Sequence, residues 1–497
     1  MEKYDVIVIG GGLLGCFTAR ALTRYRLKLA LLEAREDVCT GISRANTAII
    51  YSGADTKPGS LKSEMCVRSA QTFANLCSQL GVRYSPCGSL MISFGPRGEE
   101  VLGKKMAQGK ANGVRGLALL SREEVLSIEP NVSPAVTAGL FAPEAGTVIP
   151  WELGIAAAEN ALHNGAEFQF NSAVTRIEKV PDGYVLEAGG RPFHARGIIN
   201  CAGLYADGLH EMVAKPSVRI YPEAGDYYIL DTKASGVIRH IIFHEPEEKG
   251  KGLTLVPTVD GNILLGPSKI PSGEKNDAFP TSKEGLEWLC GLAEQVIPSL
   301  PMEHVIRSFG AVRPNPFYVR HDPDTGLLHR DDKGISDFIL HETDGAPNFL
   351  SFIGIKTPGL TCALELGLYA ADRMAALLGN LQPNDAFNPN NPAPLRLKEL
   401  SEEARAQRVR EKPSYGRIVC RCRGISEGEI IDSIHHSIGA KTVDGVKRRT
   451  GAGSGRCQGG FCTQRIIEIL SQELGIPVCD IQKDRPGSKV IGGKDHG

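Results

Sequence analysis

The stretch from Tyr4 to Gly15 reads YDVIVIGGGLLG and decides the fold of the chain. Its first half is a largely β-branched run, which is typical of a buried parallel strand. The glycines that follow match the pattern GxGxxG, and the stretch from Leu14 to about Arg24 predicts a helix. A second strand is predicted over Leu27–Leu32 and ends at Glu33. These segments together predict a β-α-β unit.

Within a β-α-β unit, the GxGxxG pattern indicates a dinucleotide site. Glycines allow a tight turn and let the pyrophosphate approach the backbone, where it lies on the N-terminus of the helix. Glu33 follows Gly15 by 18 residues, and a carboxylate at that strand end can accept hydrogen bonds from ribose hydroxyls.

Four cysteines form a second group of candidate ligands, Cys420 and Cys422 in VCRCR and Cys457 and Cys462 in RCQGGFC. Soft thiolates suit zinc, copper(I) and iron–sulfur clusters. The spacing is C-x-C, 34 intervening residues and C-x₄-C, which fits the paired C-x₂₋₄-C knuckles of zinc sites less well. A dinucleotide site and a four-thiolate site in one chain predict an electron path that takes two electrons from a substrate and passes them on singly.

Composition sets the class of protein. The chain has 497 residues, enough for two or three domains, and its net charge of −1 argues against nucleic-acid binding. We see no signal peptide and no apolar run of the roughly 18 residues that a membrane span needs. We therefore expect a cytoplasmic protein whose 13 cysteines are reduced. Any membrane association would be peripheral, through a partner or a surface patch.

The order of segments predicts the domains. Strands and helices alternate over 1–380, and a Pro/Asn-rich stretch followed by a charged helical connector predicts a linker over 381–415. The cysteine-bearing unit is expected over 416–480, followed by a tail over 481–497, which we expect to fray after Lys483.

Four further motifs follow the nucleotide site in order: GISRANTAIIYSG (41–53), INCAGLYAD (199–207), FGAVRP (309–314) and GIKTPGLT (354–361). This ordered set resembles the D-amino-acid-oxidase-like flavoproteins, which include glycerol-3-phosphate dehydrogenases, 2-hydroxyglutarate dehydrogenases and glycine or opine oxidases. The resemblance implies FAD as the dinucleotide. It also implies an α/β fold in which a Rossmann-like FAD-binding domain is interleaved with a mixed-sheet substrate domain, the latter formed by about 86–145 and 220–315.

The resemblance also implies which residues contact FAD. A helix N-terminus after Gly354 would approach flavin N1 and O2, where its dipole favours negative charge. Val174 and Arg35 would lie near the adenine. The implied FAD-binding residues are Gly10, Gly12, Leu14, Gly15, Glu33, Arg35, Ser43, Asn46, Thr47, Val174, Ala202, Gly203, Gly354, Gly359, Leu360 and Thr361.

Three residues are candidates for the chemistry. Arg313 is the expected anchor for a carboxylate or phosphate, because a guanidinium presents a planar fork of donors. Lys356 falls where glycerol-3-phosphate dehydrogenases carry a lysine near the flavin. His244 is a candidate base for the substrate hydroxyl, ahead of its neighbour His240.

Two positions depart from the family pattern. Tyr51 stands where many hydroxyacid and glycerol-phosphate relatives have histidine. Asp55 stands where the aerobic glycerol-phosphate enzymes have a phosphate-binding arginine. Both departures leave the substrate open at this point.

The cysteine unit resembles the bacterioferritin-associated-ferredoxin-like [2Fe–2S] domain, a small helical fold, and all four cysteines match its ligands. The same domain is fused to the catalytic subunit of anaerobic glycerol-3-phosphate dehydrogenases, which the whole chain resembles. Residues 401–465 hold 13 Lys or Arg and 7 Asp or Glu, a local charge of +6. This basic stretch is either a docking face for an acidic redox partner or a solvated face.

These resemblances imply oxidation of sn-glycerol-3-phosphate to dihydroxyacetone phosphate. Hydride would pass to FAD, and electrons would then pass through the [2Fe–2S] cluster to a second redox subunit or another acceptor. The alternatives are a 2-hydroxyacid dehydrogenase of the 2-hydroxyglutarate type, an amine or opine oxidase subunit, and a non-catalytic electron-transfer subunit.

Overall fold

The computed structural model describes residues 1–245, 252–271, 275–276, 279–322, 325–343, 345–379 and 381–492. The chain divides into two compact units. The first unit consists of Met1–Ala34 and Cys39–Asn390, and the second unit consists of Arg35–Val38 and Asn391–Gly497. The boundary at Asn390 lies inside the segment where the sequence predicts a linker. No helix in the described part of the chain is long and apolar enough to cross a bilayer.

The first sheet of the first unit carries the GxGxxG motif. Eight of its strands lie among the described residues: β1 (Glu2–Ile9), β2 (Leu29–Leu32), β9 (Glu167–Gln169), β10 (Val174–Val180), β11 (Gly183–Ala188), β12 (Arg191–Asn200), β20 (Leu340–Thr343) and β21 (Ala346–Phe352). The order is β10-β11-β12-β1-β2-β9, and β21 joins β12 on one side and β20 on the other. The pairs β12–β1, β1–β2, β2–β9 and β12–β21 are parallel. The predicted β-α-β unit is therefore present.

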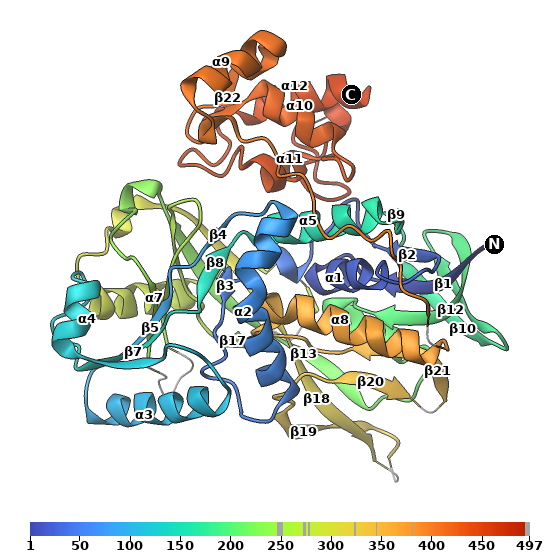
Figure 1. The fold of residues 1–497 in the computed structure, drawn as a ribbon, viewed down its shortest axis with the longest axis horizontal. Coiled ribbons are helices and arrows are strands. Elements are labelled where there is room, and N and C mark those ends of the chain that lie inside the picture. The colour runs from blue at the N-terminus through green and yellow to red at the C-terminus, as the bar shows by residue number, and fades with distance from the viewer. Residues whose placement is uncertain are drawn as a thin grey trace. The chain divides into compact units, whose positions relative to one another are not determined.

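Helices cover this sheet: α1 (Leu13–Leu22), α2 (Leu61–Leu80), α5 (Pro150–His163), α6 (Ala206–His210) and α8 (Gly359–Leu377). Helix α1 packs against α8 and α5, and α1 and α8 lie side by side in Figure 1. The contact requires a small residue, because a Cβ at Gly367 would lie 2.8 Å from the backbone of Phe17. This packing holds the N-termini of α1 and α8, the two predicted FAD-binding helix ends, in one body.

The second sheet has ten strands among the described residues: β5 (Ser89–Ser93), β6 (Ala118–Ser121), β7 (Ala138–Ala142), β13 (Val218–Leu230), β14 (Ile241–His244), β15 (Thr254–Pro257), β16 (Ile263–Leu265), β17 (Ile270–Pro271), β18 (Val305–His321) and β19 (Leu328–Gly334). The main path is β19-β18-β13-β16-β15-β14-β5-β7-β6, and β17 pairs with β13. Only β5–β14 is a parallel pair among them, so the sheet is mixed, as predicted.

The two faces of the second sheet bury different residues. One face packs on α4 (Arg122–Ile128) and α7 (Lys283–Val296), and its core includes Ile242 and Leu289. These helices lie with α3 (Pro96–Ala111) at one end of the first unit in Figure 1. The opposite face packs on a small sheet of β3 (Ile49–Ile50), β4 (Tyr84–Ser85) and β8 (Gly146–Val148), with Tyr227 in its core.

The Pro/Asn-rich stretch after α8 packs on the first unit. The backbone N–H of Asn384 donates to the carbonyl of Arg24 at 2.7 Å, and that of Asn388 donates to Oδ1 of Asn164 at 2.7 Å. The stretch therefore belongs to the first unit as far as Asn390.

The second unit is small and mainly helical, as predicted. Its elements are α9 (Glu402–Glu411), β22 (Ile418–Cys420), β23 (Ile425–Ser426), α10 (Glu427–His435), α11 (Val443–Thr450) and α12 (Thr463–Leu474). Its core is formed largely by isoleucine, leucine and valine, with Ile430, Val446 and Ile466 fully buried. Within this unit, Asp37 accepts hydrogen bonds from Arg448 at 2.9 Å and Arg449 at 2.8 Å.

The expectation that the chain frays after Lys483 is wrong for Asp484, and the second unit extends beyond residue 480, where the sequence predicts its end. Ile481 is 1% exposed and belongs to the core of the second unit. The Asp484 carboxylate accepts a hydrogen bond from Arg448 at 2.8 Å. An apolar residue and a charged partner thus hold this stretch in place. Residues 493–497 lie outside the described part of the chain.

Candidate functional site

The GxGxxG turn is built so that only glycine fits at its two ends. A Cβ at Gly15 would lie 1.8 Å from the carbonyl oxygen of Gly10, and Gly10 has φ +103° with its own Cβ position 2.6 Å from Cys201 O. At Gly12 the Cβ position meets only Ser43 Oγ, at 3.2 Å. The N-cap residue of α1, Gly12, supplies no side-chain hydrogen bond to the first turn. The turn therefore leaves backbone N–H groups and space at the helix end, which fits a pyrophosphate.

The other predicted nucleotide contacts cluster around this turn. Glu33 Oε2 accepts from Gly11 N at 2.5 Å, and Ser43 Oγ accepts from Leu13 N at 3.0 Å. Ser43 belongs to a loop closed by its own hydrogen bonds, since the Asn46 side chain donates to Ser43 O at 2.9 Å.

The remaining predicted FAD residues lie on several other elements of the chain. Ala202 and Val174 border the same apolar cluster of the first sheet. Gly203 has φ +58° and lies near Ile42. Arg35 belongs to the short segment grouped with the second unit, and its adenine contact stays a prediction. Leu14, Gly354, Gly359, Leu360 and Thr361 lie on or before the first turns of α1 and α8.

Thr361 ties the N-terminus of α8 to strand β3. Its Oγ1 accepts from Tyr51 N at 3.0 Å and donates to Ile49 O at 3.4 Å. These bonds bring Tyr51, one of the two departures from the family pattern, to the end of α8 that the sequence assigns to the flavin.

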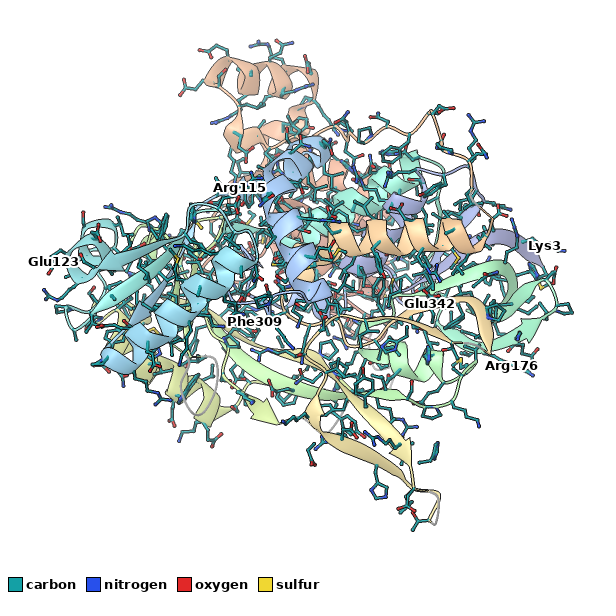
Figure 2. The ribbon with its side chains drawn as sticks, turned by 60° about the horizontal axis from the view of Figure 1, so that its bottom comes forward. Lys3, Arg115, Glu123, Arg176, Phe309 and Glu342 are labelled. Atoms are coloured by element: carbon teal, nitrogen blue, oxygen red, sulfur yellow. The ribbon has the colours of Figure 1, made fainter. Side chains whose placement is uncertain are left out.

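The β13–β18 ladder carries the candidate substrate anchor. In the antiparallel register Glu223 pairs with Arg313 and Tyr227 pairs with Phe309, so these four side chains share one face. Arg313 Nη1 donates to Glu223 Oε1 at 3.1 Å, and the Tyr227 and Phe309 rings stack with centroids 4.7 Å apart. Phe309 is labelled in Figure 2, between Glu123 at one edge and Lys3 and Arg176 at the other. Pro316, three residues after Arg313 on β18, lies against Gly354, because a Cβ at Gly354 would lie 2.5 Å from its ring; this part of β18 is therefore beside the loop that follows β21 of the first sheet.

Lys356 joins Arg313 on this face. Its Nζ donates to Asn315 Oδ1 at 3.2 Å, and Asn315 lies two residues after Arg313 on β18. Lys269 approaches from beside the ladder, with Nζ 3.6 Å from Glu223 Oε2. Arg313 and Lys269 thus flank the Glu223 carboxylate, and Lys356 adds a third cation beside Asn315, which leaves a net positive charge suited to an anion.

Two tyrosines line the same place. Burial raises the pKa of Tyr51 and of Tyr227, in spite of the opposing influence of the Arg313 charge. Both phenols therefore stay protonated at neutral pH and act as hydrogen-bond donors. Tyr51 also stacks on Phe243, with ring centroids 5.9 Å apart.

The structure does not bring His244 to this group. Phe243 faces Tyr51, and successive strand residues point to opposite faces, so His244 points to the α4–α7 side of the sheet. There it stacks on Phe94 at 5.5 Å, and its Nδ1 lies 2.7 Å from Glu245 O. His240 lies 2.8 Å from the buried Glu129.

The four predicted ligands of the second unit stand as two pairs. Cys422 Sγ and Cys457 Sγ are 3.4 Å apart and both residues are exposed. Cys420 and Cys462 are each 1% exposed and hydrogen-bond to one another. All 13 cysteines are free. Four thiols brought together as one buried and one exposed pair fit a cluster at the surface of the unit.

The loop around the cysteines supplies donors to sulfur. A hydrogen bond with Cys462 is the main cause that lowers the pKa of Cys420 to about 5, and backbone N–H groups of Gly453 and Arg423 add to it. A bond from the Phe461 N–H lowers the pKa of Cys457. Such donors favour the thiolate, which is the form that binds metal.

Sequence reasoning missed Glu223, Tyr227, Phe243, Asn315 and Lys269. None of them lies in a motif, and they meet Arg313, Tyr51 or Lys356 only through strand register and alternation. The alternation in the β14 sequence could have separated Phe243 from His244, but it could not have shown which face meets Tyr51.

Comparisons with known proteins agree with this geometry. Residues 5–373 match the family described as FAD dependent oxidoreductase, and residues 418–472 match the BFD-like [2Fe-2S] binding domain. The chain is 39% identical over 490 residues to Glycerol 3-phosphate dehydrogenase of Caloramator mitchellensis, covering 99% of this chain and 98% of the relative. It is 30% identical over 289 residues to the mitochondrial L-2-hydroxyglutarate dehydrogenase of Bos taurus, covering 54% and 61%.

Among solved structures, the dithionite-reduced L-alpha-glycerophosphate oxidase of Mycoplasma pneumoniae with FAD bound superposes with a TM-score of 0.71 at 28% identity. The match covers 80% of this chain and 100% of that one. Both predicted cofactors, FAD and a [2Fe–2S] cluster, are confirmed, and the zinc alternative falls away. The chain belongs to the FAD dependent oxidoreductase family, and its second unit contains a BFD-like [2Fe-2S] binding domain.

Proposed function

We propose that the chain is a dehydrogenase acting on a CH–OH donor, which oxidises sn-glycerol-3-phosphate to dihydroxyacetone phosphate. We propose further that the electrons leave through the [2Fe–2S] cluster to a partner. The observation that carries the proposal is the 39% identity to a glycerol 3-phosphate dehydrogenase across both units, 99% of this chain. Location in the cytoplasm, and any attachment to a membrane through the partner, remain predictions from the sequence.

The cations around Arg313 support a phosphorylated substrate. A guanidinium can bind two oxygens of a phosphate at once, and Lys356 and Lys269 add charge on the same side. Glu223 holds Arg313 at 3.1 Å and thus orients the fork. A phosphate anchored here would place the rest of a three-carbon alcohol against Tyr51 and the end of α8.

FAD, when bound, would supply the acceptor for the hydride of the carbon that bears the hydroxyl, and the hydroxyl proton would be lost to solvent. The chain's residues supply position and charge. The phenols of Tyr51 and Tyr227 donate hydrogen bonds, because burial keeps both protonated. The N-terminus of α8, held by Thr361, points its dipole at the predicted flavin edge. His244 takes no part, because it lies on the other face of its sheet.

In the second unit we propose Cys420, Cys422, Cys457 and Cys462 as the cluster ligands. No other set of four described cysteines is brought together in this unit, where the remaining one is Cys479. The backbone donors to Cys420 and Cys457 would tune the cluster, since hydrogen bonds to sulfur raise its potential.

A 2-hydroxyacid remains the second candidate substrate. L-2-hydroxyglutarate dehydrogenases match 54% of the chain, and Arg313 could equally bind a carboxylate. Their match does not extend over both units, which is why we place this candidate second.

Anaerobic mixing with a panel of substrates tests the assignment. We expect sn-glycerol-3-phosphate to bleach the flavin absorbance, and L-2-hydroxyglutarate and glycine to leave it unchanged. Bleaching by L-2-hydroxyglutarate alone would select the hydroxyacid function. Bleaching by glycine would select an amine oxidase, and no bleaching by any of them would indicate an electron-transfer subunit.

Replacement of Arg313 tests the anchor. Arg313→Ala removes a charge-assisted hydrogen bond of about 2–3 kcal/mol, so kcat/KM for sn-glycerol-3-phosphate should fall roughly 30- to 150-fold. Arg320→Ala, on the same strand but exposed and paired with Asp331, is the matched control and should change little. Equal effects of the two substitutions would remove Arg313 from the site.

The pH dependence of a Tyr51 variant tests whether this phenol stays protonated. Because burial raises the phenol pKa above its ordinary value near 10, the protonated form persists throughout pH 6–9. Tyr51→Phe should therefore lower kcat/KM by a constant factor, leaving the shape of the pH profile unchanged in that range. Loss of a limb of the profile in the variant would show that Tyr51 titrates, contrary to this account.

Replacement of Cys422 tests the ligand set. Cys422→Ser should reduce bound iron well below two atoms per chain and remove the broad cluster absorbance, while FAD stays bound because it belongs to the other unit. Cys479→Ser is the control, since this cysteine of the second unit is not among the four. Full iron content in Cys422→Ser, or its loss in Cys479→Ser, would overturn the assignment.

A further inference from the structure

The two cysteine pairs differ in exposure, so one side of the ligand site is buried and the other side faces the surface of the second unit. Cys420 and Cys462 are 1% exposed and lie in the core with Ile430 and Ile466. Cys422 and Cys457 are exposed. A cluster on these ligands would therefore present one edge to its surroundings, at the exposed pair.

The residues around the exposed pair are basic and partly apolar. The segments 416–424 and 451–464, which carry all four ligands, contain four arginines and no aspartate or glutamate. Arg421 and Arg456, the residues directly before the exposed cysteines, are themselves exposed. Glu427, a buried carboxylate of the same unit, forms ion pairs with Arg417 and with Arg465, the one with Arg465 at 3.1 Å.

An aromatic ring stands at the same edge. Phe461 is 57% exposed, and the Arg421 guanidinium lies over its ring at 4.4 Å from the centroid. Arginine and aromatic residues are enriched in protein interfaces. The cation–π contact holds both side chains in one arrangement next to Cys422 and Cys457. We call Arg421, Cys422, Arg456, Cys457 and Phe461 the cluster edge.

We propose that the cluster edge is the docking surface for a one-electron acceptor protein whose own redox centre is surrounded by acidic residues. The inference rests on the proposed exit of electrons through the cluster. Charge complementarity selects the partner: the four arginines of the two ligand segments outweigh the charge of about −2 to −3 that a [2Fe–2S] cluster and its four thiolates carry, so this surface is net positive although the whole chain has a net charge of −1. Electron-transfer encounters are small and brief, and complementary charge raises their association rate by about 10- to 1,000-fold at low salt.

The test compares two acceptors of opposite surface charge. Holoenzyme is reduced with dithionite, so the outcome does not depend on the identity of the substrate, and is mixed with cytochrome b5, which is acidic around its haem, or with cytochrome c, which is basic there. Oxidation of the cluster is followed by stopped-flow absorbance. Both acceptors take electrons from a cluster of the same potential. Comparing how salt and the substitutions change the rate with each acceptor therefore separates the effect of docking from the effect of driving force.

The expected result has two parts. For the wild type, the rate with cytochrome b5 should fall at least tenfold as ionic strength rises from about 0.01 to 0.3 M, because screening shortens the reach of charge to a few ångströms. The double variant Arg421→Glu/Arg456→Glu should lose that dependence and react faster with cytochrome c. The milder double variant Arg421→Gln/Arg456→Gln should show a salt dependence between those of the wild type and the Glu variant. It replaces the Glu variant in the test if that variant loses iron.

Arg410→Glu is the matched control. Its change of charge, −2, equals that of Arg421→Gln/Arg456→Gln but falls on an exposed residue of α9 in the same unit, so it should alter either rate by less than about twofold. Rates that change neither with ionic strength nor in the two double variants would overturn the proposal. So would equal effects of Arg410→Glu, which would indicate steering by total charge.

Discussion

The register between β13 and β18 is the constraint on which the candidate active site depends. It sets Arg313 across from Glu223 and Tyr227 across from Phe309, and alternation then turns Asn315 toward Lys356. A one-residue slip of β18 would turn Arg313, Asn315 and Phe309 to the opposite face of the sheet. The anion-binding charge is therefore a property of a strand pair, although two of its cations come from outside the pair.

The sequence predicted the parts that local rules govern. GxGxxG requires glycine for reasons within one turn, and the structure shows the same clashes that the motif implies, at Gly10 and Gly15. The cysteine spacing likewise identified a cluster domain, because ligands of one small unit leave a short-range pattern. Motif position also singled out Arg313 and Lys356, which the structure brings to one face of β18 through Asn315.

What the sequence could not supply was long-range pairing. His244 was a reasonable base as a histidine in an apolar strand, yet the face it occupies depends on which neighbour Phe243 meets, and Tyr51 is far away in the chain. Glu223 and Tyr227 carry no motif and enter through register alone. The predicted start of the tail at residue 481 was wrong because composition does not show that Ile481 packs in the core of the second unit.

The central claim is that one chain joins an FAD site to a [2Fe–2S] cluster on a single electron path. Rapid-freeze EPR after anaerobic mixing with one equivalent of sn-glycerol-3-phosphate tests it most directly. We predict that flavin bleaching is followed by the EPR signal of a reduced [2Fe–2S] cluster within the same turnover. A bleached flavin beside a cluster that stays oxidised and EPR-silent would contradict the account.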